Sequence, residues 1–91
     1  MGHMKTNKDP LLARIRRIAG QVAAIEKAIV RDADCGSVLH QVAGVRGALG
    51  GLLDELVADH VRQHLASPGL TDEERTQAAE DLIAAIRRYA K

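Results

Sequence analysis

The amino-acid sequence predicts an all-α fold, and three observations support this prediction. Ala, Leu, Arg and Glu are abundant, a composition that favours helix. Apolar residues recur with helical spacing in three successive segments. Each segment is bounded by residues typical of helix ends. We expect one domain spanning residues 1–91, with residues 1–8 forming a flexible N-terminal arm.

The first helix is predicted to start at Asp9, an N-cap residue, with Pro10 in the first helical position. Apolar residues then follow with a 4-3-4-3-4 spacing, which is typical of a heptad seam facing a partner helix. Asp32 and Asp34 interrupt this pattern, and Asp34 can cap the next helix. The seam residues are Leu11, Ile15, Ile18, Val22, Ile25 and Ile29.

The second helix is predicted to run from about Asp34 to Ser67, and Pro68 and Gly69 then end it. Thr71 and Glu74 form a capping-box pattern that opens a third helix, which runs to about Tyr89. The second helix carries a seam of its own with the same heptad spacing. Its members are Cys35, Leu39, Val42, Arg46, Leu49, Leu53, Leu56 and His60.

Cys35, His60 and His64 share one stripe of the second helix and form a candidate metal site. At about 100° per residue, the two histidines lie within about 20° of Cys35 around the helix axis. Along the axis, however, Cys35 and His60 are about 37 Å apart. Metal–thiolate and metal–imidazole bonds are only about 2 to 2.3 Å long. Ligands to a shared ion must therefore come from different copies of the chain, arranged antiparallel.

Three glycines in the second helix support such an arrangement. Gly47, Gly50 and Gly51 each cost helix stability relative to Ala. If Cys35 of one copy meets His60 or His64 of another, the two helices cross close to these glycines. Small residues at a crossing let backbones approach closely, although a local kink is the alternative explanation.

The remaining histidines differ in their relation to this site. His40 points about 140° away from Cys35 around the helix, so we expect it to lie elsewhere. His3 could fold over as a further ligand. The alternative is that Gly2, His3 and Met4 were left by cloning.

Positive charge is concentrated at the N-terminal end of the chain. Residues 1–31 contain seven Lys or Arg and two acidic residues, a net charge of +5, whereas residues 32–91 carry −4. This asymmetry favours a polyanionic partner, and a solvated basic helix face is the simpler alternative. Arg and Lys can neutralise phosphates, and Arg and Gln can also read base edges. We expect an exposed DNA-binding stripe made of Lys8, Arg14, Arg17 and Gln21.

Other classes of protein are disfavoured. No apolar run is long enough to span a membrane, and the N-terminus lacks the apolar region of a signal peptide. A single cysteine cannot form an internal disulfide, which fits a reducing cytoplasm. There is no phosphate-binding loop or nucleophile motif, so we expect neither an enzyme nor a small-molecule substrate.

Several motifs together resemble the CsoR/RcnR family of bacterial transcriptional repressors. They are Arg14-Ile-Arg-Arg-Ile-Ala-Gly-Gln-Val22, Cys35, Gln41-Val-Ala-Gly-Val-Arg-Gly-Ala48, Gly51-Leu52 and His60. The resemblance covers residues 9–91. It implies a helical protein in which antiparallel four-helix-bundle dimers pair into a tetramer. It also implies that operator DNA is bound without effector and released when effector binds.

Within this family the resemblance is strongest to the RcnR-like nickel/cobalt branch, whose ligand set matches His3, Cys35, His60 and His64. Copper(I) sensors have a second Cys where this chain has His64, and persulfide sensors also need a second Cys. Formaldehyde sensors use the matching Cys with proline at position 2, where this chain has Gly2. We therefore expect a Ni(II)- or Co(II)-responsive repressor. The alternatives are a Zn(II)- or Cu(I)-responsive member, a formaldehyde sensor reacting at Cys35, and a helical interaction module without DNA binding.

Overall fold

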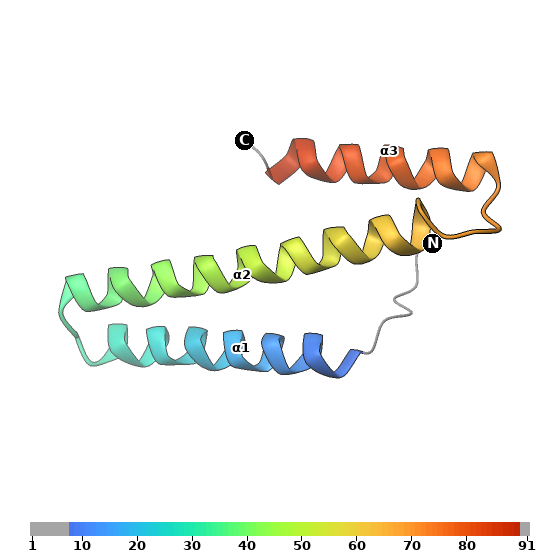
Figure 1. Cartoon of the computed structure of the whole chain (residues 1–91). Coiled ribbons are helices and arrows are strands. Elements are labelled where there is room, and N and C mark those ends of the chain that lie inside the picture. Colours follow the sequence, from blue (N-terminus) through green and yellow to red (C-terminus); the bar gives the residue numbers. More distant parts are fainter. Residues whose placement is uncertain (1–7, 90–91) are drawn as a thin grey trace. The chain divides into compact units, whose positions relative to one another are not determined.

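The computed structural model describes residues 8–89, and the regular structure in this range consists of three α-helices (Figure 1). They are α1 (Lys8–Val30), α2 (Cys35–His64) and α3 (Asp72–Tyr89). The predicted all-α fold is confirmed. The described chain divides into two compact units, residues 8–54 and residues 55–89, with α2 contributing to both. None of the described helices has the length and hydrophobicity needed to cross a membrane.

Two helix boundaries differ from the prediction. Helix α1 begins at Lys8, so Lys8 belongs to the helix rather than to an arm, and Asp9 lies in the first turn rather than at the N-cap. A carboxylate there still interacts favourably with the helix dipole. Helix α2 ends at His64, three residues before Ser67. The backbone N–H groups of Leu65 and Ala66 both donate hydrogen bonds to the carbonyl of Val61. Because both use the same acceptor, the regular helical hydrogen-bond pattern ends there.

The turn between α1 and α2 is held by backbone hydrogen bonds and one side-chain cap. Ala33 N–H donates to the Ala28 carbonyl at 2.9 Å and Asp32 N–H to the Ile29 carbonyl at 3.1 Å, as in a Schellman motif. This motif places Asp32 in the left-handed region, with φ at 61°. Asp34 then accepts a hydrogen bond from Ser37 N–H at 3.1 Å, which confirms the predicted cap of α2.

In the unit of residues 8–54, α1 packs antiparallel to the first part of α2 (Figure 1). Helix α1 contributes Leu11, Ile18 and Ala28 to the core, and Ala28 is completely buried. Helix α2 contributes Val45 and Leu52, which lie seven residues apart on one face. Neither belongs to the heptad seam predicted for the second helix, so that seam does not face α1.

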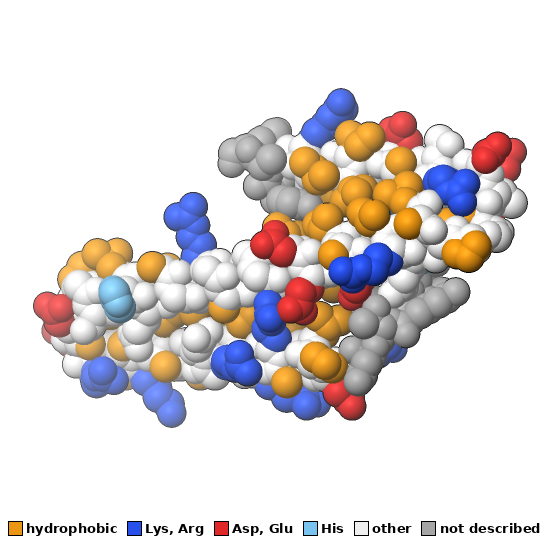
Figure 2. Space-filling view, viewed as in Figure 1, with side chains coloured by type: hydrophobic (Ala, Val, Ile, Leu, Met, Phe, Trp, Pro, Cys, Tyr) orange, Lys and Arg blue, Asp and Glu red, His pale blue; other side chains and the backbone are white. Residues whose placement is uncertain are grey.

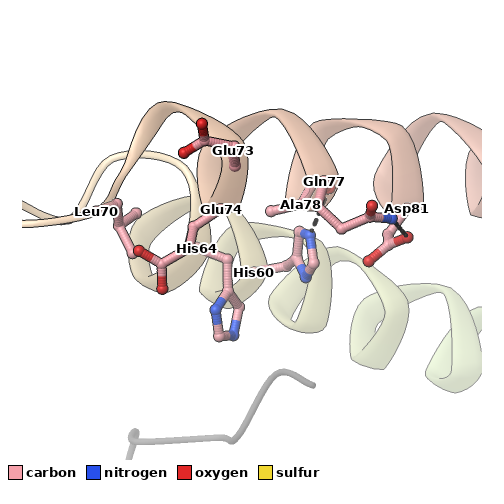
Figure 3. Close-up of a pocket in the computed structure, with 8 residues that line it drawn as sticks. All are labelled: His60, His64, Leu70, Glu73, Glu74, Gln77, Ala78 and Asp81. Atoms are coloured by element: carbon pink, nitrogen blue, oxygen red, sulfur yellow. Dashed lines mark hydrogen bonds between the residues drawn. The ribbon is translucent and has the colours of Figure 1, made fainter.

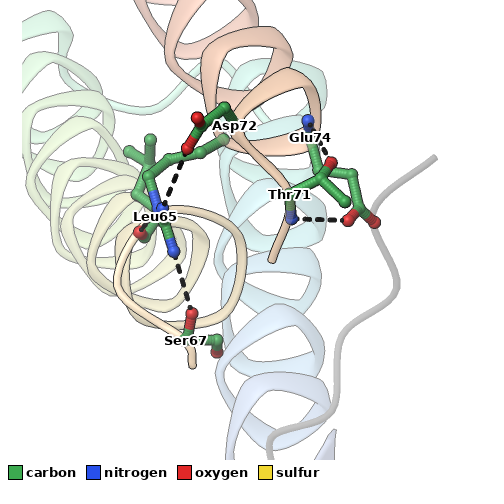
Figure 4. Close-up of polar contacts among 6 residues, drawn as sticks. Leu65, Ser67, Thr71, Asp72 and Glu74 are labelled. Atoms are coloured by element: carbon green, nitrogen blue, oxygen red, sulfur yellow. Dashed lines mark hydrogen bonds and ion pairs between the residues drawn. The ribbon is translucent and has the colours of Figure 1, made fainter. Parts of the chain in front are cut away.

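In the unit of residues 55–89, side chains of α3 satisfy groups at its own start and at the end of α2 (Figure 4). Thr71 N–H donates to Glu74 Oε1 at 2.9 Å and Glu74 N–H to Thr71 Oγ1 at 3.0 Å, which confirms the capping box. Arg75 donates to the Leu65 carbonyl at 2.8 Å and to the Ser67 carbonyl at 3.4 Å. These carbonyls lie beyond the last turn of α2, where helical partners are lacking.

The single chain leaves many apolar side chains uncovered, and some of them are visible near the start of α2 and on α3 (Figure 2). In the predicted α2 seam, Leu39 is 65 %, Val42 48 % and Leu49 46 % exposed. Fully burying an exposed side chain of this kind contributes about 1.5 to 3 kcal/mol, and roughly half of that remains to be gained here. The α2 seam therefore offers another helix a largely apolar surface, in which Arg46 lies between Val42 and Leu49.

The capping box predicts how part of the stability depends on pH. Its hydrogen bonds with Thr71, chiefly the one from the backbone N–H, lower the pKa of Glu74 below its usual 4.5. A carboxyl with a lowered folded-state pKa stabilises the fold above its unfolded pKa and loses that contribution as pH falls through the folded value. We expect Glu74→Gln to lower the free energy of unfolding at pH 7. We also expect this free energy to fall less steeply in the variant than in wild type as the pH is lowered.

Thermal unfolding followed by circular dichroism between pH 7 and pH 3 measures this effect. Glu73→Gln is the matched control, because Glu73 lies in the same helical turn but outside the Thr71–Glu74 pair. Equal acid sensitivity of the Glu74→Gln variant and wild type would show that the capping box contributes nothing to the pH dependence.

Candidate functional site

His60 and His64 lie one helical turn apart at the end of α2, and both are half-buried. Their ring centroids are 5.1 Å apart and the ring planes are inclined by 51° (Figure 3). Residues four apart share one helix face, so both imidazoles project from the same side of α2. The structure thus brings two of the predicted ligands together as the sequence indicated.

A hydrogen bond to α3 fixes the ring of His60. Its Nε2 lies 3.0 Å from the carbonyl oxygen of Ala78. A carbonyl only accepts hydrogen bonds, so Nε2 carries the proton and donates it. In the neutral ring, the lone pair is then on Nδ1. Metal-binding histidines commonly donate their other ring N–H to a carbonyl or carboxylate in this way, which sets both tautomer and ring orientation.

The histidine pair borders a hollow of about 420 Å³ between the end of α2 and the start of α3 (Figure 3). Helix α3 lines the other side with several polar side chains, including Glu73, Gln77 and Asp81. The carboxylates of Glu73 and Asp81 beside the two imidazoles make this region favourable to cations. Within residues 8–89, however, no three His, Cys, Asp or Glu residues are grouped so that they could hold a metal ion.

Cys35, the third predicted ligand, is the first residue of α2, and its thiol is free and exposed. His64 is the last residue of the same helix. A helix of this length rises about 45 Å from end to end. The structure therefore does not bring Cys35 to the histidine pair within one chain, in agreement with the geometry expected from the sequence.

The other two histidines are not part of the pair. His40 is exposed and borders a separate hollow together with Arg31, Ser37 and Gln41. His3, predicted as the further ligand, lies outside the described residues, so its place in a site stays a prediction.

The predicted DNA-binding residues all lie on α1. Lys8, Arg17 and Gln21 are exposed, as expected. Arg14 is instead half-buried, which corrects the prediction of a fully exposed stripe. Its guanidinium lies close to the backbone of α2 at Gly51.

Three features of these regions had not been predicted from the sequence. They are the acceptor role of the Ala78 carbonyl, the contacts of Arg75 with the end of α2, and the packing of Arg14 on Gly51. The first two involve backbone carbonyls as acceptors. Every residue has such a carbonyl, so the amino-acid sequence does not indicate which one is used. The third has a signal in Gly51 itself, but the sequence indicates a helix crossing or a local kink there and not a contact with Arg14.

The hydrogen bond to Ala78 predicts the tautomer of His60. At a pH where the ring is neutral, we expect the proton on Nε2 and the lone pair on Nδ1. Long-range ¹H–¹⁵N correlation spectra of the imidazole groups distinguish the two tautomers, and His40 provides an exposed reference ring. A neutral His60 protonated on Nδ1 would contradict the assignment.

Comparison with known proteins identifies the family. A family model described as metal-sensitive transcriptional repressor matches residues 7–88. The transcriptional repressor RcnR of Salmonella arizonae is 36 % identical over 86 residues, which cover 94 % of this chain and 93 % of that protein. An uncharacterized protein in the bioA 5′ region of Serratia marcescens is 43 % identical over 91 residues, the full length of both chains.

A solved structure shows that the fold is shared as well. The formaldehyde-responsive regulator FrmR from Salmonella enterica serovar Typhimurium, in a variant with one glutamate replaced by histidine, matches with a TM-score of 0.88. The two chains are 38 % identical, and the match covers 97 % of this chain and 99 % of that one. Proteins of this family are transcriptional repressors and not enzymes. The chain belongs to the CsoR/RcnR family of metal-sensitive transcriptional repressors.

Proposed function

We propose that this protein binds operator DNA in its metal-free form and releases it on binding Ni(II) or Co(II), and so controls metal efflux or homeostasis in the cytoplasm. The ion is held by Cys35 of one subunit and by His60 and His64 of a second subunit, with His3 completing the ligand set. The protein acts as a tetramer of two antiparallel dimers.

The observation that carries this proposal is the placement of the ligands on α2. Cys35 opens the helix, and the two histidines lie at its end. In an antiparallel pair of α2 helices, each Cys35 approaches the histidines of the other copy. Such a dimer has two equivalent sites related by its two-fold axis.

The surface between the ligands supports the pairing of two copies. Leu39, Val42 and Leu49 form an exposed apolar row along α2. Gly47 and Gly50 have no atom within 4 Å of the position a Cβ would occupy, so a second helix can approach there. A partner could also satisfy Gln41, whose buried Oε1 has no hydrogen bond within the described chain.

The chemistry of the donor set supports Ni(II) or Co(II). Imidazole nitrogen suits Ni, Cu and Zn, and a single thiolate adds one soft, anionic donor. The Nδ1 atom of His60 carries the lone pair that the Ala78 hydrogen bond leaves available. Zn(II) accepts the same donors, so selection between these ions depends on coordination geometry and on His3.

The DNA surface consists of Lys8, Arg14, Arg17 and Gln21 on α1. The cationic side chains bind phosphates and release counterions, which makes binding strongly salt-dependent. Metal lowers DNA affinity if it binds more tightly to a conformation that binds DNA poorly. By linkage, DNA then lowers metal affinity by the same factor.

Metal titration of a protein–DNA complex tests the function. The DNA is a labelled duplex enriched from a randomised pool by the metal-free wild-type protein. We expect Ni(II) or Co(II) to weaken binding by about 5- to 150-fold, the usual range of such coupling. Zn(II) and Cu(I), delivered in the same way, should act more weakly.

Three variants define the site in the same assay. Cys35→Ala and His64→Ala should bind DNA normally but lose the response to metal. His40→Ala is the matched control, because this exposed histidine lies on the same helix away from the pair. Metal-dependent DNA release that survives in Cys35→Ala would rule out the proposed site, and DNA binding that is insensitive to salt would rule out the DNA surface.

A formaldehyde response is the second candidate function, favoured by the likeness to FrmR and by the exposed thiol of Cys35. The thiol would add across the aldehyde carbonyl, forming an S–C bond while its proton passes to the oxygen. Intact-mass measurement after formaldehyde treatment, with Cys35→Ala for comparison, tests this reaction. A Cys35-dependent mass gain accompanied by DNA release, without any response to metal, would favour this candidate over the metal sensor.

A further inference from the structure

Arg14 of α1 packs directly on the backbone of α2 at Gly51. A Cβ atom placed on Gly51 would lie 2.8 Å from Nη1 of Arg14 and 3.9 Å from its Cζ. Both residues belong to the unit of residues 8–54. The guanidinium therefore occupies space that exists only because residue 51 has no side chain.

The neighbouring glycines show that this contact is specific to Gly51. Gly44 lies two helical turns earlier and about 20° away around the axis of α2. Gly44 also has no side chain, yet no atom lies within 4 Å of the position that a Cβ would occupy there. The same is true of Gly47 and Gly50. Among the glycines in the middle of α2, only Gly51 has Arg14 seated on it.

We infer that Gly51 is a positioning residue for Arg14: its bare backbone leaves a seat, the space in which the guanidinium lies and from which it can contact a DNA phosphate. This inference rests on the proposed role of Arg14 in DNA binding. Arg14 is half-buried whereas Arg17, one turn along α1, is exposed. A seated arginine has already lost part of its rotamer freedom, so less entropy is lost when it binds DNA.

The Gly51→Ala variant should move Arg14 without destabilising helix α2. No real Cβ tolerates a neighbour at 2.8 Å, so Arg14 has to move. The atom in conflict is the far end of a flexible side chain, so the backbone can stay in place. Alanine is also a better helix former than glycine. The variant should thus form α2 at least as readily as wild type while its Arg14 loses the seat.

The test compares Gly51→Ala, Gly44→Ala and Arg14→Ala with the double variant Gly51→Ala/Arg14→Ala, all full-length and metal-free. Affinity is measured by fluorescence anisotropy on the duplex enriched by the wild-type protein, at several salt concentrations. Thermal unfolding is measured in parallel. Relaxation of the arginine side-chain ¹⁵Nε signals reports the mobility of Arg14 without DNA.

We expect Arg14→Ala to weaken DNA binding by about ten-fold or more and to reduce the salt slope by about 1. Gly51→Ala should weaken binding by about three- to ten-fold, a range that corresponds to part of the rotamer entropy of one arginine side chain. It should also raise the mobility of the Arg14 Nε signal. Gly44→Ala should change neither quantity, and the double variant should bind DNA as Arg14→Ala does.

Three outcomes would overturn the inference while leaving the proposed function intact. Gly51→Ala could bind DNA as tightly as wild type or more tightly. It could weaken binding further in the background of Arg14→Ala, which would show that Gly51 acts through another residue. The Arg14 Nε signal could keep its wild-type mobility. By contrast, DNA binding that is unchanged in Arg14→Ala would contradict the proposed DNA surface itself.

Discussion

The continuity of α2 is the constraint on which the candidate site depends. The helix is unbroken from Cys35 to His64, so its own rise of about 1.5 Å per residue keeps the thiol away from the imidazoles. No rotamer of these side chains can close such a distance within one helix. A site that uses all three ligands requires a second copy, and metal binding is then inseparable from assembly. The exposed apolar row that includes Leu39 and Leu49 lies between the two ligand positions, where such a copy would pack.

Features controlled by local sequence could be predicted. The hydrogen bonds of Asp34 with Ser37 and of Thr71 with Glu74 span three residues each, so the pattern of residue types is sufficient to find them. Helix existence followed from periodicity in the same way. Boundaries were less accurate, because α2 ends where backbone groups close the last turn, and residue types alone do not indicate that point.

Contacts between distant residues could not be predicted in the same way. The hydrogen bond from His60 to the Ala78 carbonyl joins residues eighteen positions apart and uses an acceptor that every residue possesses. The packing of Arg14 on Gly51 depends on the rotamer of a long side chain and on how closely α1 approaches α2. These contacts matter for the proposed function, because the first leaves Nδ1 of His60 as the nitrogen with a lone pair and the second sets where the Arg14 guanidinium lies.

Mixing two defective variants tests most directly whether the metal site is shared between subunits. Cys35→Ala lacks the thiolate, and the double variant His60→Ala/His64→Ala lacks the imidazoles, so neither alone should bind Ni(II) tightly. After joint unfolding and refolding, half of randomly paired dimers are mixed, and each mixed dimer has one intact site of two. Equilibrium dialysis should then find about a quarter of the wild-type number of Ni(II) sites. A mixture that binds no more Ni(II) than the separate variants would contradict a site shared between subunits.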